Sequence, residues 1–164
     1  EDVLFGFAIG GIAAVIFEVV FRTRLRKLSH HSKHIIKTWA IALIFVLALL
    51  ILLALGLNSI YASAIAFVVA AIPILFYRHD LLLNAVGSGV CVMLVMFVSY
   101  YLLFNLASNT ETLMKEQWLI HGTSLDLRFA GIPLTEMAWG FTWGFLAGPL
   151  YEFILNKRNY KTRP

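Results

Sequence analysis

Glu136 is the residue whose neighbours in the sequence best suit acid chemistry. It lies three residues after Pro133, at the start of an apolar segment, and Trp139 and Trp143 follow it one helical turn apart. A carboxylic acid beside aromatic faces could protonate an apolar double bond, and the rings could stabilise the resulting cation. The same residues also have structural interpretations. An acid in the first turn complements the helix dipole, and aromatic residues commonly form a belt at a membrane interface.

A second copy of this pattern lies near the start of the chain. At a constant offset, Asp2 aligns with Glu136. The other aligned pairs are Gly6 with Gly140, Phe7 with Phe141, Gly10 with Gly144, Ala14 with Gly148 and Glu18 with Glu152. Carboxylates are costly to keep in hydrocarbon, so repeated acids are candidates for function. We take Glu136, Asp2 and Glu1 as the candidate catalytic acids. Candidate substrate contacts are the nearby aromatic residues, Trp139, Trp143, Phe5, Phe7 and Phe141.

Small residues recur at every fourth position between these acids. They are Gly6 and Gly10 in the first copy, and Gly140, Gly144 and Gly148 in the second. Residues four apart are neighbours on a helix surface, and stripes of small residues let another helix approach closely. We therefore expect both stripes to be helix-packing surfaces.

Composition indicates a membrane protein, because 60% of the 164 residues are hydrophobic and only 13% are charged. Crossing a bilayer takes roughly 20 helical residues. Five segments are long enough: 3–21, 39–57, 60–77, 81–104 and 132–155. The predicted fold is an all-α, polytopic membrane helix bundle of about five transmembrane helices, with the first and last as repeat equivalents. We treat residues 1–164 as a single membrane domain, and we expect upstream residues to be missing because the chain begins inside the first motif.

The distribution of Lys and Arg predicts the orientation. One side of the predicted bundle carries most of them: Arg22, Arg24, Arg26, Lys27, Lys33, Lys37, Arg78, Lys157, Arg158, Lys161 and Arg163. Only Lys115 and Arg128 fall on the other side. The first side should be cytoplasmic, which places the C-terminus inside a cytoplasmic membrane that we expect to be prokaryotic. The net charge of +4 comes from short loops between apolar spans, so nucleic acid is not an expected partner.

Other polar residues give weaker signals. Glu18 and Glu152 precede basic residues, and we expect interfacial salt bridges there. In the fourth span a polar patch could form from Tyr100, Tyr101, Asn84 and Ser88. His30, His31 and His34, with His79 on the same side, could bind a metal. They alternate with basic residues, however, which favours a strip that contacts anionic headgroups. We assign no metal.

The second motif resembles a known family. Residues 131–136 read Gly-Ile-Pro-Leu-Thr-Glu, and residues 148–152 read Gly-Pro-Leu-Tyr-Glu. Together they resemble the membrane-integral lycopene cyclase domain of heterodimeric bacterial cyclases and fungal fusion proteins. The resemblance implies two motif copies, with Glu1 and Asp2 as the acids of the first and Glu136 as the second acid of the later one. Thr135 stands where the family pattern has the other acid.

This resemblance implies a carotenoid end-group cyclase, a lycopene cyclase-like isomerase. Its reaction would be a proton-initiated isomerisation of an acyclic, apolar polyene without net redox change. No cofactor is evident, because the glycine pairs lack the strand-then-helix setting of a phosphate-binding loop. The expected partners are membrane lipid and the polyene, in a homo- or hetero-oligomer.

Two non-enzymatic alternatives stay open. One is a non-catalytic membrane scaffold, or a lipid- or carotenoid-binding subunit of a larger complex. The other is a transporter. Its binding sites would normally lie at the membrane midplane, whereas the acids are expected near the interfaces, which argues against this alternative.

Overall fold

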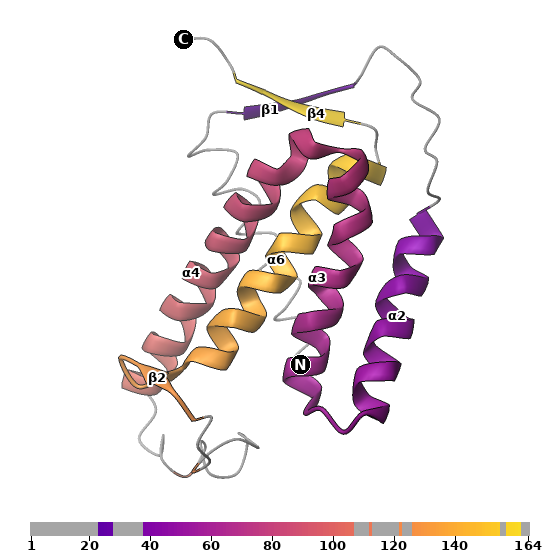
Figure 1. Cartoon of the computed structure of the whole chain (residues 1–164). Helices are drawn as coiled ribbons and strands as arrows, with labels where there is room; N and C mark the ends of the chain where they lie inside the picture. The colour runs from indigo at the N-terminus through magenta and orange to yellow at the C-terminus, as the bar shows by residue number, and fades with distance from the viewer. Residues whose placement is uncertain are drawn as a thin grey trace.

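The computed structural model describes residues 23–27, 38–106, 112, 122, 126–154 and 157–161. Four α-helices dominate this part of the chain (Figure 1): α2 (Thr38–Ala54), α3 (Ser59–Tyr77), α4 (Leu82–Leu106) and α6 (Leu134–Ile154). They lie near the predicted second to fifth spans, so the mostly helical fold is confirmed. The predicted first span, 3–21, lies outside the described residues. The five-helix count and the equivalence of the first and last helices therefore remain predictions.

Individual residues at the connections explain where the helices end and begin. Gly56, with φ +83°, follows α2 in a backbone conformation that favours glycine. Asn58 then caps α3, because its side-chain oxygen accepts a hydrogen bond from the backbone N–H of Ile60 at 3.0 Å. At the other end of α3, the short 3-10 helix η1 (His79–Leu81) leads directly into α4. Both connections between these helices are therefore short turns.

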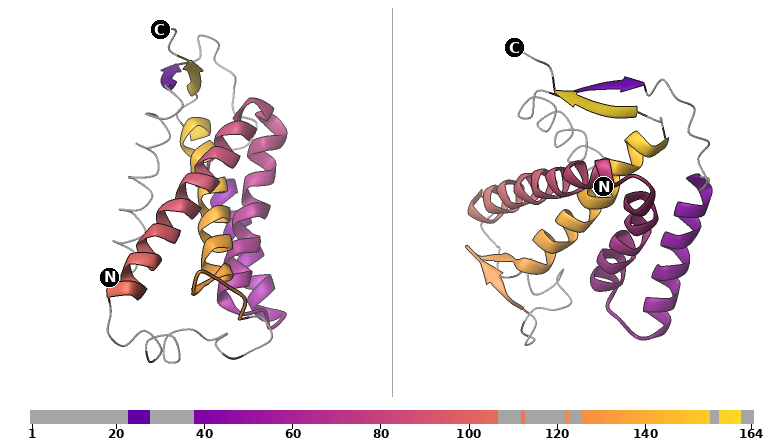
Figure 2. Two further views of the ribbon diagram at one scale, coloured as in Figure 1. Left: turned by 90° about the vertical axis from the view of Figure 1, so that its left-hand side faces the viewer. Right: turned by 45° about the horizontal axis from the view of Figure 1, so that its top comes forward.

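Helix α6 lies between its neighbours. It packs against α4 on one side and α3 on the other, α2 packs against α3, and contacts between α3 and α4 themselves are sparse. Figure 1 and the right-hand view of Figure 2 show the order α4, α6, α3, α2 across the bundle. The last described helix is therefore one of the two inner helices, with α3 as the other.

Two short antiparallel ribbons interrupt the helical fold, and the all-α prediction did not include them. Strand β1 (Thr23–Lys27) pairs with β4 (Lys157–Lys161), and β2 (Arg128–Phe129) pairs with β3 (Ile132–Pro133). The β1–β4 ribbon joins the two basic runs at the end of the bundle where α3 ends and α4 begins (Figure 1). Both runs thus lie at one end, as the charge distribution predicts for one membrane side.

Two helices in the described part of the chain are long and apolar enough to cross a membrane, Ser59–Tyr77 and His79–Leu106. The apolar helix Trp39–Ala54 is shorter. Helix α6, which carries two glutamates, is not one of the two. Many large apolar side chains of α2, α3 and α4 are exposed, among them Leu50, Ile51, Ile72 and Leu94.

Candidate functional site at the start of helix α6

A tight hairpin places Glu136 at the start of α6. Strands β2 and β3 are joined by Ala130 and Gly131, both with positive φ, and the backbone N–H of Leu134 donates to the carbonyl of Leu127 at 2.8 Å. Ile132 is fully buried beside β2. Since this hairpin fixes where the helix begins, Glu136 falls in the first turn.

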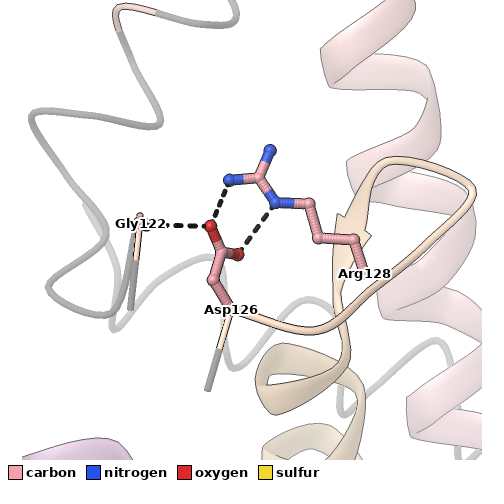
Figure 3. A network of polar contacts seen from close by, with 3 residues as sticks. All are labelled: Gly122, Asp126 and Arg128. Atoms are coloured by element: carbon pink, nitrogen blue, oxygen red, sulfur yellow. Dashed lines mark hydrogen bonds and ion pairs between the residues drawn. The ribbon is translucent and has the colours of Figure 1, made fainter. Parts of the chain in front are cut away.

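An ion pair stabilises the strand that enters this hairpin (Figure 3). Arg128 donates from Nε to Asp126 Oδ1 at 2.8 Å and from a terminal nitrogen to Oδ2 at 2.6 Å. The backbone N–H of Gly122 donates to the same carboxylate at 3.1 Å. The hydrogen bonds between Arg128 and Asp126, together with the negative charge of Asp126, raise the pKa of the Arg128 guanidinium above its ordinary value.

The carboxyl group of Glu136 meets a phenol from α4. Tyr100 donates its hydroxyl hydrogen bond to Glu136 Oε2 at 3.1 Å. The contact exists because α4 and α6 pack along their length, so that the late part of α4 lies beside the first turn of α6. The Tyr100 ring also lies against Phe104, with centroids 5.8 Å apart. Among the polar residues that the sequence marks in this span, Tyr100 is the one beside the candidate acid.

Trp139, the next turn along α6, is held by α3. Its indole Nε1–H donates to Ser63 Oγ at 2.9 Å, and the Ser63 hydroxyl donates to the carbonyl of Ile60 at 3.1 Å. Trp139 stacks on Trp143 with centroids 5.9 Å apart, and it meets Phe67 edge-on at 5.9 Å. Both tryptophans also pack against the buried pair Val92 and Met96 of α4. The indoles therefore lie where α3, α4 and α6 come together.

Phe141 lies elsewhere on α6. Its ring stacks on Phe145 with centroids 5.9 Å apart. It covers Gly89 of α4, where an added Cβ would lie 2.8 Å from the Phe141 carbonyl oxygen and 2.9 Å from its ring. The structure thus brings Trp139 and Trp143 together and gives Phe141 separate partners.

The glycines of α6 lie against α4. A Cβ added at Gly144 would lie 2.6 Å from the carbonyl oxygen of Ser88 and 2.9 Å from the Cα of Gly89. One added at Gly140 would meet the sulfur of Met96, and one at Gly148 would meet the side chain of Ser88. These contacts bring α4 close enough to α6 for Tyr100 to reach Glu136.

These three helices identify the family of the chain. The family model described as lycopene cyclase matches residues 58–154, from the cap of α3 to the end of α6. The chain belongs to the lycopene cyclase family. The match includes Tyr100, Glu136, Trp139 and Trp143. The chain matches none of the curated proteins and none of the solved structures.

Membership of the lycopene cyclase family supports a carotenoid cyclase-like function and a place in carotenoid biosynthesis. Together with the two long apolar helices, it also suggests integration into a membrane. The match does not distinguish the heterodimeric from the fusion type of cyclase. Within the described residues, no group of three His, Cys, Asp or Glu side chains could hold a metal ion.

Several predicted site residues lie outside the described part of the chain. They are Glu1, Asp2, Phe5, Gly6, Phe7 and Gly10, with Glu18 and the histidines His30, His31 and His34. Their roles in this lycopene cyclase family member therefore remain predictions. At Thr135, where the family pattern has an acid, the side-chain oxygen is buried and has no hydrogen-bond partner among the described residues.

The second glutamate of α6 lies at the opposite end of the helix. Glu152 is only 4% exposed and interacts with the positive charge of Arg78 and with the side-chain amide of Asn84. Arg78 also forms two 2.9 Å hydrogen bonds with Asp80. The sequence pointed to the basic residues that follow Glu152. The structure also places Arg78, at the end of α3, near Glu152, while the side chains of the following basic residues lie outside the described part.

Proposed function

We propose that this chain is a carotenoid end-group cyclase that isomerises an acyclic, apolar polyene without net redox change. One observation carries the proposal. Glu136 and Trp139 lie three residues apart in the first turns of α6, and each is fixed by a hydrogen bond with a different helix. An acid and an aromatic face fixed in neighbouring positions are what proton-initiated cation chemistry requires.

In the proposed reaction, the Glu136 carboxyl group protonates the terminal double bond of the polyene. The π electrons of that bond form the new C–H bond, and a carbocation remains on the neighbouring carbon. A second double bond attacks this cation and closes the ring, and loss of one proton restores a double bond. One proton is gained and one is lost, so the product is an isomer of the substrate. The stacked faces of Trp139 and Trp143 stabilise the cation. We propose that Glu1 and Asp2 flank the same end of the polyene.

The test is pigment analysis in lycopene-accumulating cells that express the full chain. The parent should produce cyclised carotenoid, and Glu136→Gln should lower the rate by roughly 10²–10⁴-fold, as for loss of a general acid. Glu152→Gln is the matched control, because it makes the same change in the same helix roughly 24 Å away, at 1.5 Å per residue. Undiminished cyclisation by the Glu136→Gln variant would show that Glu136 is not the proton donor.

Thr135 favours a second function, that of a non-catalytic scaffold or carotenoid-binding subunit. It replaces an acid of the family pattern, while the glycine contacts with α4 serve packing without any chemistry. This alternative predicts that the parent chain makes no cyclised pigment, while acyclic carotenoid co-purifies with it. Co-purified pigment with cyclised end groups, formed only when Glu136 is intact, would exclude it.

A further inference from the structure

We infer that Tyr100 is a positioning residue for the acid: its hydrogen bond to Glu136 Oε2 orients the carboxyl group for proton transfer and stabilises the carboxylate that remains. The inference rests on the proposed function, and it goes further by assigning Tyr100 a role in the proton transfer.

The chemistry of the carboxyl group allows this hydrogen bond before and after proton transfer. A protonated carboxyl group keeps one carbonyl oxygen that accepts, and a carboxylate accepts through both oxygens. Tyr100 donates to Oε2 at 3.1 Å. Tyr100 can therefore keep its hydrogen bond to Glu136 while the proton leaves.

The same hydrogen bond also favours the product of proton transfer. Once the proton has left, Glu136 is a carboxylate, and hydrogen bonds to a charged acceptor are stronger than those to a neutral one. Tyr100 thus binds the carboxylate more tightly than the acid. This difference accelerates the step that forms the carbocation, because it stabilises charge that develops only during the reaction.

The packing of α4 against α6 fixes the position of Tyr100 relative to Glu136. Tyr100 lies one turn beyond Met96, which is 4% exposed and lies against Gly140. Helix α4 therefore cannot rotate around α6 without displacing buried side chains. The Tyr100 hydroxyl group is held by the helix contact and by the Phe104 ring.

The variant Tyr100→Phe removes the hydroxyl group and keeps the ring. With the full chain in lycopene-containing membranes, we expect kcat to fall roughly 10- to 100-fold, as for a lost hydrogen bond to a charged group. The KM for lycopene should stay unchanged, because the ring and the packing remain. The matched control is Tyr101→Phe, at the next residue of α4, where the ring stacks on Phe97.

An infrared measurement tests the hydrogen bond independently of activity. The carbonyl stretching band of protonated Glu136 is the band that Glu136→Gln removes. Tyr100→Phe should move it to higher frequency because the carbonyl oxygen loses its donor, and Tyr101→Phe should leave it in place. A band that does not move, absence of any such band in the parent, or an unchanged kcat in Tyr100→Phe would overturn the inference. Cyclisation that survives Glu136→Gln would refute the proposed function instead, and the band would still report whether Tyr100 holds Glu136.

Discussion

Gly144 and Gly140 lie one turn apart on the same face of α6, and replacing each with alanine should give clearly different stabilities. At Gly144, the added Cβ would meet only backbone of α4, the carbonyl oxygen of Ser88 at 2.6 Å and the Cα of Gly89 at 2.9 Å. Backbone cannot rotate away, so α4 must move. At Gly140, the added Cβ would meet the thioether of Met96, a flexible group that can adopt another rotamer.

The expected magnitudes follow from two opposing terms. Overpacking a well-packed contact costs about 1–3 kcal/mol, and the backbone contact at Gly144 places it near the upper end. Replacing glycine by alanine inside a helix contributes about 0.5–1 kcal/mol of stabilisation. Gly144→Ala should therefore lose about 2 kcal/mol of unfolding free energy, while Gly140→Ala should stay close to the parent.

The assay is reversible unfolding in mixed micelles, followed by the helical circular dichroism signal. Both variants and the parent are measured in the same detergent, so that differences in unfolding free energy reflect the packing alone. Equal stability of the two variants, or a Gly144→Ala variant more stable than the parent, would refute the close approach of α4 and α6 at this position.

Three further predictions concern other parts of the bundle. Ser63→Ala removes the acceptor for the Trp139 indole and should cost about 0.5–1.5 kcal/mol of stability, the net contribution of one hydrogen bond, with altered tryptophan fluorescence as a second measurement. Arg78→Met removes a cation that is hydrogen-bonded to Asp80 and interacts with the buried Glu152. It should cost about 1–3 kcal/mol by the same unfolding assay, a prediction contradicted by a variant as stable as the parent. Cysteines introduced one at a time as Asn58→Cys and His79→Cys, in a background without the native cysteine, should be labelled from opposite faces of the membrane, position 79 from the cytoplasmic face. Labelling of both from one face would contradict a membrane-spanning α3.

The helices and the surroundings of Glu136 follow from local patterns in the sequence. Apolar length predicts α2, α3 and α4, and proline followed by an acid predicts the start of α6. Spacing of four residues marks the face of α6 that lies against α4. The same spacing of Ala62, Ala66 and Ala70, all fully buried in α3, is a signal that sequence reasoning did not use.

The partners across helices could not be predicted. Ser63 and Trp139 are 76 positions apart, and their contact depends on how far α3 and α6 rotate about their own axes. Nothing in one sequence fixes that rotation, because several faces of α3 are apolar. Arg78 and Glu152 meet for the same reason, through helix packing that brings one end of α3 to the far end of α6. The charge runs indicated a membrane side, but not that β1 and β4 pair as strands.

The place of α6 between α3 and α4 has a consequence for biogenesis. A ribosome makes α3 and α4 before α6, yet these two helices scarcely touch each other, and each packs against the helix still to come. During insertion, the serine and glycine backbone of α4 and the hydroxyl group of Ser63 therefore face lipid or the insertion machinery instead of their final partners. A nascent chain that has not yet released α6 has neither the acid nor the tryptophans in place. The candidate site therefore forms only when α6 docks between α3 and α4.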